Sequence, residues 1–258
     1  MVTFLLKKSY RLKDLKEINF KDLWGDHGIF TTMWIFDKPP KILFFENHLS
    51  NLLKSLKKYN INKKFIKKDI LQIINKNLSK KKNYNHLLRI AINKSTISIS
   101  LRKRLVPKIN FNLQLVKLKR EKPQFKNLKY KKILFHLSKM DNSKSDIGLV
   151  FKNKLLETGT SNLLFIKNNK IYSPKKDFYE GVTYKFFRSK VKKISKKEIF
   201  INELKKFEEI LLIGSGKGVT SVKTIKQISW KRKKLKYYKI FSRYYRSAIN
   251  SCNLYKFK

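Results

Sequence analysis

The chain has 258 residues, and its 63 lysines and arginines against 17 acidic residues give a formal net charge of +46. Hydrophobic residues make up 41% and aromatic residues 13% of the chain, which is enough for a folded core and excludes a disordered polycation. The length suits one compact unit or two small lobes. No apolar run approaches the roughly 18 residues that a membrane span needs, and the single cysteine excludes an internal disulfide. We therefore expect a folded protein of the reducing cytoplasm, with no membrane segment.

The basic residues are mostly lysine, since nine arginines accompany 54 lysines. Specific recognition of bases and phosphates favours the bidentate arginine fork, and the lysines are spread along the whole chain instead of forming one stripe. The composition therefore predicts no specific nucleic-acid partner, only weak binding of polyanions at low salt. The four histidines are scattered and the cysteine is alone, so the sequence predicts no metal site.

The first part of the chain has the pattern of a mixed α and β lobe. Residues 30–36 and 41–45 are typical of strands, and the two prolines between them indicate a hairpin turn. Leucines and isoleucines at helical spacing then predict two amphipathic helices, at 49–56 and 66–74. Strand-type sequence returns in residues 87–92, 97–101 and 109–118. We predict a smaller N-terminal α+β lobe over residues 1–118.

A second series of elements follows Pro123 and predicts a larger C-terminal lobe over residues 124–258. Its predicted strands are residues 147–151, 163–166, 170–172, 209–213 and 219–225, and its predicted helices are residues 128–137, 182–191 and an aromatic helix around Tyr237 to Tyr245. The sequence contains no internal repeat of fixed period.

Three features of the second lobe suggest chemistry. The glycine-rich turn at 214–218 and the helix start at Gly181 could present backbone N–H groups to an anion, although turns and helix starts of this kind also occur for conformational reasons. Glu157 is one of few acidic residues and precedes a polar cluster, although a surface carboxylate would look the same. Neither the Walker pattern nor the dinucleotide fingerprint is present.

Taken in order, these segments resemble the signature of the class IV pyridoxal-phosphate enzymes. This family contains branched-chain and D-amino-acid aminotransferases and aminodeoxychorismate lyase. The resemblance covers roughly residues 24 to 226. The segments that carry it are GDHGIFTT (25–32), ENHL (46–49), LLETGTSNLLF (155–165), KIYSP (170–174), GVT (181–183), EEILLIGSG (208–216) and VTSV (219–222).

The resemblance implies a two-lobed α+β / α/β fold, that of the D-amino-acid-aminotransferase-like enzymes, with pyridoxal 5'-phosphate as cofactor. In the segment PQFKNLKY (123–130), Lys126 occupies the place of the family's Schiff-base lysine. Glu157 would contact the pyridine nitrogen. The phosphate would be held by four residues at the helix start and the glycine-rich turn: Val182, Thr183, Ser215 and Gly216. Composition alone could not distinguish Lys126 from the other lysines.

Three positions depart from the family's pattern. The arginine that usually contacts the cofactor phosphate is Asn51 here, the asparagine of the lysine motif is Lys129, and the arginine usual after Gly-Ile-Thr is Tyr184. A charge-assisted contact contributes roughly 1.5 to 3 kcal/mol, so the absence of the arginine at position 51 predicts about 10-fold weaker cofactor binding unless a lysine substitutes.

Within the family, the short chain, the segment Phe30-Thr31-Thr32 and the spacing around Lys126 look most like aminodeoxychorismate lyase. The resemblance thus implies a lyase that converts the small molecule 4-amino-4-deoxychorismate to 4-aminobenzoate and pyruvate, a step towards folate, and implies a homodimer. One alternative is a branched-chain or D-amino-acid aminotransferase, because the cofactor-binding residues are shared. A second alternative is a basic binding protein that keeps the fold without catalysis, which Asn51 motivates.

Overall fold

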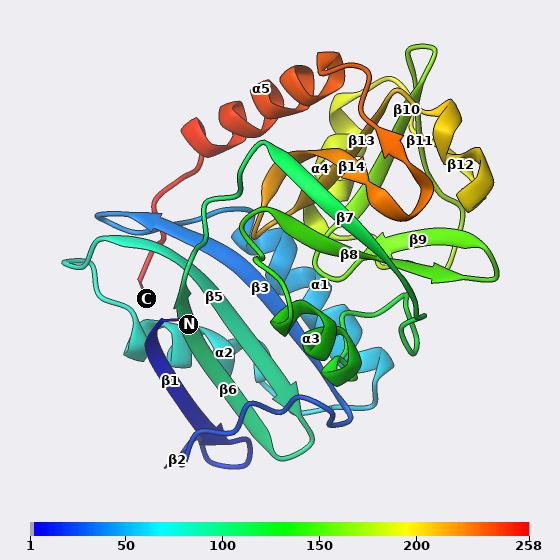
Figure 1. Ribbon diagram of the computed structural model, residues 1–258. Coiled ribbons are helices and arrows are strands. Elements are labelled where there is room, and N and C mark those ends of the chain that lie inside the picture. Colours follow the sequence, from blue (N-terminus) through cyan, green and yellow to red (C-terminus); the bar gives the residue numbers. More distant parts are fainter. Residues whose placement is uncertain (1–2, 258) are drawn as a thin grey trace. The chain divides into compact units, whose positions relative to one another are not determined.

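The structure, a computed structural model, describes residues 3–257 and divides into two compact units (Figure 1). Unit 1 comprises Met1–Arg104, Phe125–Tyr130 and Ile249–Lys258, and unit 2 comprises Leu105–Gln124 and Lys131–Ala248. Two units were expected, but their bounds differ from the predicted break between residues 118 and 124. One reason is that residues 105–118, which include the strand at Asn110–Lys117, belong to unit 2. The other is that two short segments, distant in sequence, pack into unit 1.

Unit 1 is a six-stranded antiparallel sheet with the strand order β2-β1-β6-β5-β3-β4. Helices α1 (Phe45–Lys58) and α2 (Ile66–Asn77) lie together behind one face of it (Figure 1). The strands are β1 (Phe4–Arg11), β2 (Glu17–Ile18), β3 (Gly28–Asp37), β4 (Lys41–Ile42), β5 (Tyr84–Asn93) and β6 (Thr96–Lys103).

The two faces of this sheet differ in chemistry. Alternate residues of β3, including Ile29, Met33 and Ile35, are buried in one core with the leucines of α1 and the isoleucines of α2. The residues between them, such as Phe30 and Trp34, point to the opposite face, since successive side chains of a strand alternate. The helix-covered face is therefore aliphatic, whereas the opposite face carries aromatic rings.

Unit 2 is built on a nine-stranded mixed sheet with the strand order β12-β11-β10-β13-β14-β7-β8-β9, and β15 pairs with β14. Parallel pairs join β7 to β14, β7 to β8 and β11 to β12. Its strands are β7 (Asn110–Lys117), β8 (Ser145–Phe151), β9 (Lys154–Thr158), β10 (Asn162–Lys167), β11 (Lys170–Pro174), β12 (Ser195–Lys197), β13 (Glu209–Gly214), β14 (Gly218–Ile225) and β15 (Trp230–Lys231). Its helices are α3 (Lys131–Ser138), α4 (Val182–Lys190), α5 (Lys236–Asn250) and the 3₁₀ turns η1 (Ile201–Lys206) and η2 (Lys226–Ile228).

The sheet of unit 2 curls, because β9 at one end of the strand order lies against β10 and β11. The curl encloses a core that includes Phe111, Phe165 and Trp230. The rings of Phe187 on α4 and Phe241 on α5 lie 4.8 Å apart, which packs these two helices against each other. Among the described residues, no helix is long and apolar enough to cross a membrane.

Helix α5 begins at a buried carboxylate. Glu209, 1% exposed, accepts hydrogen bonds from the backbone N–H groups of Tyr237 (2.9 Å) and Tyr238 (3.0 Å). A negative charge at a helix N-terminus satisfies N–H groups that lack an intrahelical partner and complements the helix dipole.

We expect Glu209→Gln to lower the free energy of unfolding by about 1–2 kcal/mol, because the amide keeps the shape but loses the charge and one acceptor oxygen. Urea unfolding followed by circular dichroism measures this change. The matched control is Glu208→Gln, which removes only a surface ion pair with Lys234 and is expected to change stability by less than about 0.5 kcal/mol. Equal effects of the two substitutions would contradict the capping role.

The periodic elements are confirmed where the pattern is strong. Both predicted helices of the first lobe, the hairpin after residue 36, the strands around Asn168 and the aromatic helix all form. The second strand of that hairpin is shorter than the predicted residues 41–45, since β4 covers Lys41–Ile42 and α1 begins at Phe45. Helix α3 begins at Lys131 and not at residue 128. Strand β7, predicted in the first lobe, belongs to unit 2 because it pairs with β14 and β8.

Candidate active site

Lys126 is fixed in unit 1 by its backbone. Its carbonyl accepts a hydrogen bond from the N–H of Phe30 (2.9 Å), and the N–H of Leu128 donates to the carbonyl of Gly28 (2.9 Å). A Cβ at Gly28 would lie 2.4 Å from the Ile92 carbonyl oxygen, so this close approach requires glycine. The ammonium of Lys126 lies 5.1 Å from the centroid of the Phe30 ring. The start of β3 thus places the predicted Schiff-base lysine.

A buried histidine lies near Lys126. His48 on α1 is 4% exposed, and its Nδ1 lies 2.8 Å from the hydroxyl of Thr31. Burial, and to a smaller extent the charge of Lys126, lowers the pKa of His48 to about 3. His48 is therefore a neutral hydrogen-bonding group at physiological pH.

The His48 pKa has a consequence for acid stability. In the unfolded chain this ring binds a proton below its ordinary pKa of 6.5, whereas the folded state binds none until about pH 3. The contribution of this group to the free energy of unfolding is therefore largest above pH 6.5. It decreases as the pH falls from 6.5 towards 3, by up to about 1.4 kcal/mol per pH unit.

We expect His48→Asn to lose less stability than the wild type between pH 6 and 4, measured by urea unfolding at each pH. The exposed His27, changed to asparagine, is the control, and an unchanged slope in His48→Asn would contradict the assignment.

In unit 2, Glu157 forms a buried ion pair with Arg120. The Nε of Arg120 donates to one carboxylate oxygen of Glu157 (2.7 Å) and its Nη2 to the other (3.2 Å), with side-chain exposures of 3% and 7%. The backbone N–H of Tyr179 also donates to Glu157 (3.3 Å). Burial raises the pKa of the Tyr179 phenol to about 12, against the opposing effect of the Arg120 charge. Glu157 is thus a buried, oriented carboxylate. The alternative that it is an ordinary surface carboxylate is wrong.

Arg120 was not among the predicted site residues. The sequence offers one signal for it: Arg120 is one of nine arginines in a chain with 54 lysines, and it lies six residues before Lys126. Its partner could not be inferred, because Glu157 lies 37 positions away.

The predicted phosphate-binding residues of unit 2 converge. Gly181 precedes α4 with extended backbone and no side-chain cap, so the helix begins with backbone N–H groups of Val182 and Thr183. The hydroxyl of Thr183 lies 3.4 Å from that of Ser215. Asn162 fixes this helix start by accepting from the Gly181 N–H (3.1 Å) and donating to the Tyr179 carbonyl (2.5 Å). A helix N-terminus and two hydroxyls at one place suit an anion.

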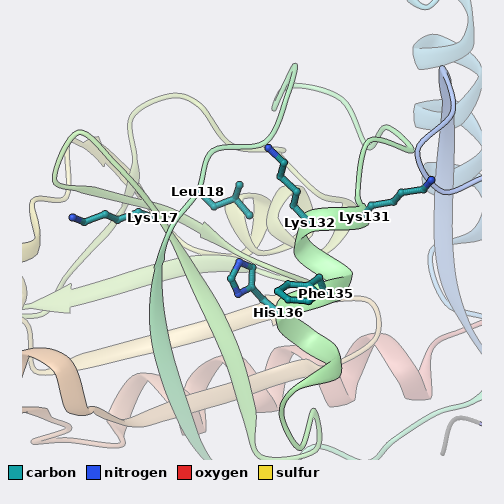
Figure 2. A pocket seen from close by; sticks show the side chains of 6 residues that line it. All are labelled: Lys117, Leu118, Lys131, Lys132, Phe135 and His136. Atoms are coloured by element: carbon teal, nitrogen blue, oxygen red, sulfur yellow. The ribbon is translucent and has the colours of Figure 1, made fainter.

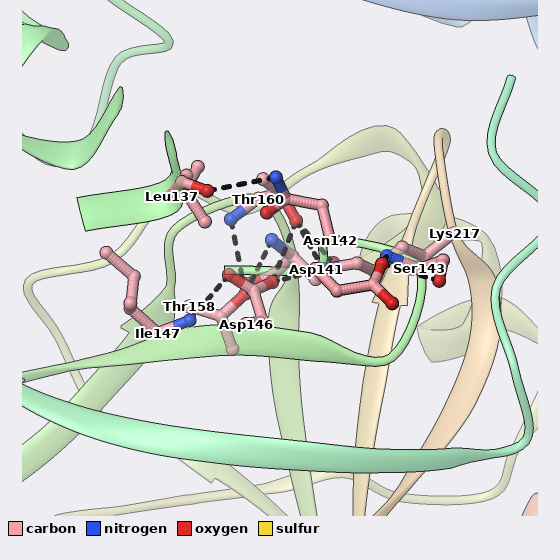
Figure 3. A network of polar contacts seen from close by, with 10 residues as sticks. Leu137, Asp141, Asn142, Ser143, Asp146, Ile147, Thr158, Thr160 and Lys217 are labelled. Carbon is pink, nitrogen blue, oxygen red and sulfur yellow. Dashed lines mark hydrogen bonds and ion pairs between the residues drawn. The ribbon is translucent and has the colours of Figure 1, made fainter. Parts of the chain in front are cut away.

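A second ion pair holds the glycine-rich turn. Figure 3 shows Thr158, Thr160 and Lys217 pointing toward the carboxylate of Asp146, which is fully buried. The two threonine hydroxyls each donate at 2.8 Å, and the ammonium of Lys217 donates at 2.5 Å. Lys217 also donates to the Thr160 hydroxyl (2.9 Å). The network connects the turn that contains Ser215 and Gly216 to the segment that follows Glu157.

The three departures from the family's pattern have different surroundings. Asn51 lies on α1 one turn after His48. The side chain of Lys129 is exposed, and Tyr184 is fully buried with its hydroxyl 3.0 Å from that of Ser173. Tyr184 therefore belongs to the core of unit 2.

An open pocket of about 460 Å³ lies beside α3 and is lined by Lys117, Leu118, Lys131, Lys132, Phe135 and His136 (Figure 2). It includes none of the predicted site residues. Within residues 3–257, no group of three or more histidine, cysteine, aspartate or glutamate side chains could hold a metal ion.

Comparison with known proteins identifies a family for this chain. The model of one family, amino-transferase class IV, matches residues 28–225. No curated protein matches the chain. Three solved structures of similar fold illustrate the structural neighbours.

A branched-chain aminotransferase from Thermoproteus uzoniensis, solved with norvaline, is 14% identical with a TM-score of 0.76, and the match covers 94% of this chain and 95% of that one. A branched-chain amino acid aminotransferase from Thermobaculum terrenum, in its PLP form, is 13% identical with a TM-score of 0.74 and 94% coverage of both chains. A Legionella pneumophila protein described as a 4-amino-4-deoxychorismate lyase is 16% identical with a TM-score of 0.67, covering 87% of this chain and 90% of that one.

At these identities the solved structures establish the fold, and they confirm the predicted fold class. The family model spans most of the chain and establishes more than the fold. The chain belongs to the amino-transferase class IV family, whose members are pyridoxal-phosphate-dependent enzymes.

Proposed function

We propose that the protein is a pyridoxal-phosphate-dependent lyase that converts 4-amino-4-deoxychorismate to 4-aminobenzoate and pyruvate. The observation that carries this proposal is the position of Lys126. Its amine lies over the ring of Phe30, and Thr31 and Thr32 follow Phe30 on the same strand. The segment Phe30-Thr31-Thr32 and the spacing around Lys126 are the features most like the lyases of the family. The structural neighbour described as a 4-amino-4-deoxychorismate lyase supports the same choice.

The residues present fit the cofactor. The Arg120–Glu157 ion pair provides an oriented carboxylate to accept a hydrogen bond from a pyridine N–H. The start of α4, with the hydroxyls of Thr183 and Ser215 at 3.4 Å, provides donors for a phosphate. We propose that Val182, Thr183, Ser215 and Gly216 bind the phosphate, that Glu157 binds the ring nitrogen, and that Lys126 carries the cofactor.

The chain's own residues then perform the proton transfers. Pyridoxal phosphate, when bound, supplies a ring that accepts electron density from the substrate carbon. The Lys126 amine would remove the proton from that carbon and return it to the methylene carbon of the enolpyruvyl group as the C–O bond to the ring breaks, so that the group leaves as pyruvate. Glu157 would keep the ring nitrogen protonated, and Arg120 holds Glu157 in place.

We propose that the active protein is a homodimer in the cytoplasm with a small-molecule substrate, as in the family. The net charge of +46 adds weak binding to polyanions at low salt.

The product distinguishes this function from its nearest alternative. Purified protein with pyridoxal phosphate and 4-amino-4-deoxychorismate is expected to release pyruvate and 4-aminobenzoate without any amino acceptor, measured by coupled lactate dehydrogenase and by fluorescence. If turnover requires a 2-oxo acid and no pyruvate appears without one, the protein is an aminotransferase. That second candidate is favoured by the branched-chain aminotransferases among the structural neighbours.

A third outcome would replace both enzyme functions. Protein that stays colourless with excess pyridoxal phosphate, yet binds nucleic acid at physiological salt, would be a non-catalytic binding protein of the same fold. Asn51, in place of the usual arginine, is the residue that motivates this possibility.

A further inference from the structure

Helix α5 (Lys236–Asn250) presents a row of positive charge to solvent. Its basic side chains are all exposed and recur every three or four positions: Lys236, Lys239, Arg243 and Arg246. This spacing places the four side chains on one face of the helix. With a rise of about 1.5 Å per residue, neighbouring charges follow each other at about 4.5 to 6 Å along the helix axis. The helix contains no acidic residue. We call these four residues the α5 stripe.

The opposite face of α5 is fixed on unit 2, and this packing sets the direction of the α5 stripe. Phe241 is fully buried and Tyr245 is 6% exposed. Their ring centroids lie 4.8 and 6.3 Å from that of Phe187 on α4, and a Cβ at Gly218 would lie 2.8 Å from a ring carbon of Tyr245. Figure 1 shows α5 at the outer edge of unit 2. A helix that binds a lipid bilayer inserts its apolar face. Because the apolar face of α5 is buried, only the stripe is open to a partner.

The cations of the α5 stripe have no acidic partner within residues 3–257. Their one described side-chain hydrogen bond runs from the ammonium of Lys236 to the amide oxygen of Asn169 (3.1 Å), which is neutral. The two carboxylates just before the helix in the fold are already bonded, since Glu208 pairs with Lys234 and Glu209 accepts from the first N–H groups of α5. The charge of the stripe is therefore not neutralised by the described residues.

Two of the four cations are arginines, in a chain with nine arginines and 54 lysines. Four other arginines pair with carboxylates: Arg11, Arg89, Arg120 and Arg188. Arg243 and Arg246 are exposed, lie three positions apart, and pair with no carboxylate among the described residues. A guanidinium binds a phosphate in bidentate fashion and also stacks on flat rings. Two of them on an open helix face favour a ligand that carries phosphates.

Two half-buried tyrosines lie along one edge of the α5 stripe. Tyr237 and Tyr244 are seven residues apart, which is two helical turns, so they lie on the same side of the helix. The hydroxyl of Tyr237 donates to the Asn169 carbonyl (2.6 Å), and the Lys236 ammonium lies 5.9 Å from the centroid of its ring. Aromatic rings beside a row of cations are the arrangement on which unpaired bases stack while the phosphates follow the charges. A duplex would use the charges alone.

We propose that the outer face of α5 binds single-stranded nucleic acid without sequence specificity, with phosphates on the α5 stripe and a base on the ring of Tyr244. The inference goes beyond the proposed function and does not depend on it, since the stripe includes none of the residues proposed to hold the cofactor. Binding of this kind needs no contact to base edges. It therefore agrees with a composition that predicts no sequence-specific partner.

The test measures binding of a fluorescein-labelled oligouridylate to the full-length protein by fluorescence anisotropy, at several KCl concentrations. We expect Arg243→Gln combined with Arg246→Gln to weaken binding about 10-fold or more at low salt. The slope of log K against log[KCl] should become shallower by about 1.4, because each phosphate contact on a single strand contributes about 0.7. The matched control is Lys67→Gln combined with Lys68→Gln, which removes the same charge from two exposed lysines of α2 in unit 1.

Tyr244 gives a second readout that does not depend on salt. Tyr244→Ala should weaken oligouridylate binding about 5-fold or more and leave the salt slope unchanged, since stacking releases no counterions. Tyr244→Phe should keep the wild-type affinity, because the ring remains. Equal binding of an oligodeoxythymidylate would assign the site to both DNA and RNA, and weaker binding would assign it to RNA.

The proposal is wrong under any of three results. If the Lys67 and Lys68 control weakens binding as much as the arginine pair does, the binding belongs to the net charge of the whole chain. If the arginine pair has the wild-type affinity, or loses affinity only together with a lower melting temperature, the helix face is not the site. If duplex RNA of equal length binds as tightly as the single strand and Tyr244→Ala has no effect, the ligand is not single-stranded.

The nucleic-acid site and the enzyme can fail separately. The variant with both arginines replaced should keep the absorption band of bound pyridoxal phosphate, because none of the proposed cofactor residues lies on α5. A protein that releases pyruvate but binds no oligouridylate would retain the lyase and lose this proposal. A protein that binds oligouridylate through α5 but releases no pyruvate would retain this proposal and lose the lyase.

Discussion

Replacing Lys126 with alanine is expected to lower turnover by about 10⁴-fold or more, because in the proposed function this amine both attaches the cofactor and transfers the substrate proton. Wild-type protein with pyridoxal phosphate should show an absorption band near the visible edge, and borohydride should attach the cofactor covalently to Lys126. Lys126→Ala should lack that band. Peptide mass spectrometry after reduction identifies the modified residue.

The control for Lys126 is Lys129→Ala, three residues along the chain. Lys129 is exposed, so its loss should leave the band and the turnover unchanged. The two variants remove the same charge from the same segment. If Lys126→Ala keeps the band and the turnover, or if the reduced cofactor is found on another lysine, the assignment of the catalytic amine is wrong.

Replacing Arg120 with methionine is expected to lower the free energy of unfolding by about 3–5 kcal/mol, since it leaves the buried carboxylate of Glu157 without its counter-ion. The variant also loses the hydrogen bond from Arg120 to the Pro123 carbonyl (2.8 Å). Urea unfolding measures the change. The same variant should bind pyridoxal phosphate more weakly, because Glu157 loses the two hydrogen bonds that orient it.

Two further variants isolate the ion pair. Lys119→Met removes the adjacent cation, whose partner Asp177 is partly exposed, and should cost less than about 1 kcal/mol. The double variant Arg120→Met with Glu157→Met should recover much of the lost stability, because neither charge is then buried alone. A double variant no more stable than Arg120→Met would show that the loss comes from packing and not from the charge.

How much of the fold the sequence predicts depends on how far apart along the chain the interacting residues lie. The helices α1 and α2 follow from leucines and isoleucines at helical spacing, which is a local signal. Strand β1 was not predicted, because Lys7 and Lys8 interrupt its apolar residues, yet it pairs with β6 along most of its length. Pairing with a distant strand is not encoded in local periodicity.

The same distinction applies to the candidate site. Lys126 and Glu157 were identified through motifs, since nothing local separates one lysine from 53 others. The partners Arg120 and Lys217 were missed because their carboxylates lie 37 and 71 positions away.

Unit 1 is assembled from three separate parts of the chain, and this sets an order during synthesis on the ribosome. The six strands and two helices can pair once residue 104 has emerged, and the segment with Lys126 joins β3 about twenty residues later. The predicted Schiff-base lysine can therefore be seated on the sheet before Glu157 and α4 have emerged from the ribosome. Residues 249–257 complete the unit only after unit 2 has been synthesised, when Tyr255 donates from its N–H to the Pro40 carbonyl and from its hydroxyl to Asn75, both at 2.8 Å. A nascent chain thus carries the proposed reactive lysine on a formed sheet before the residues proposed to hold the cofactor have folded.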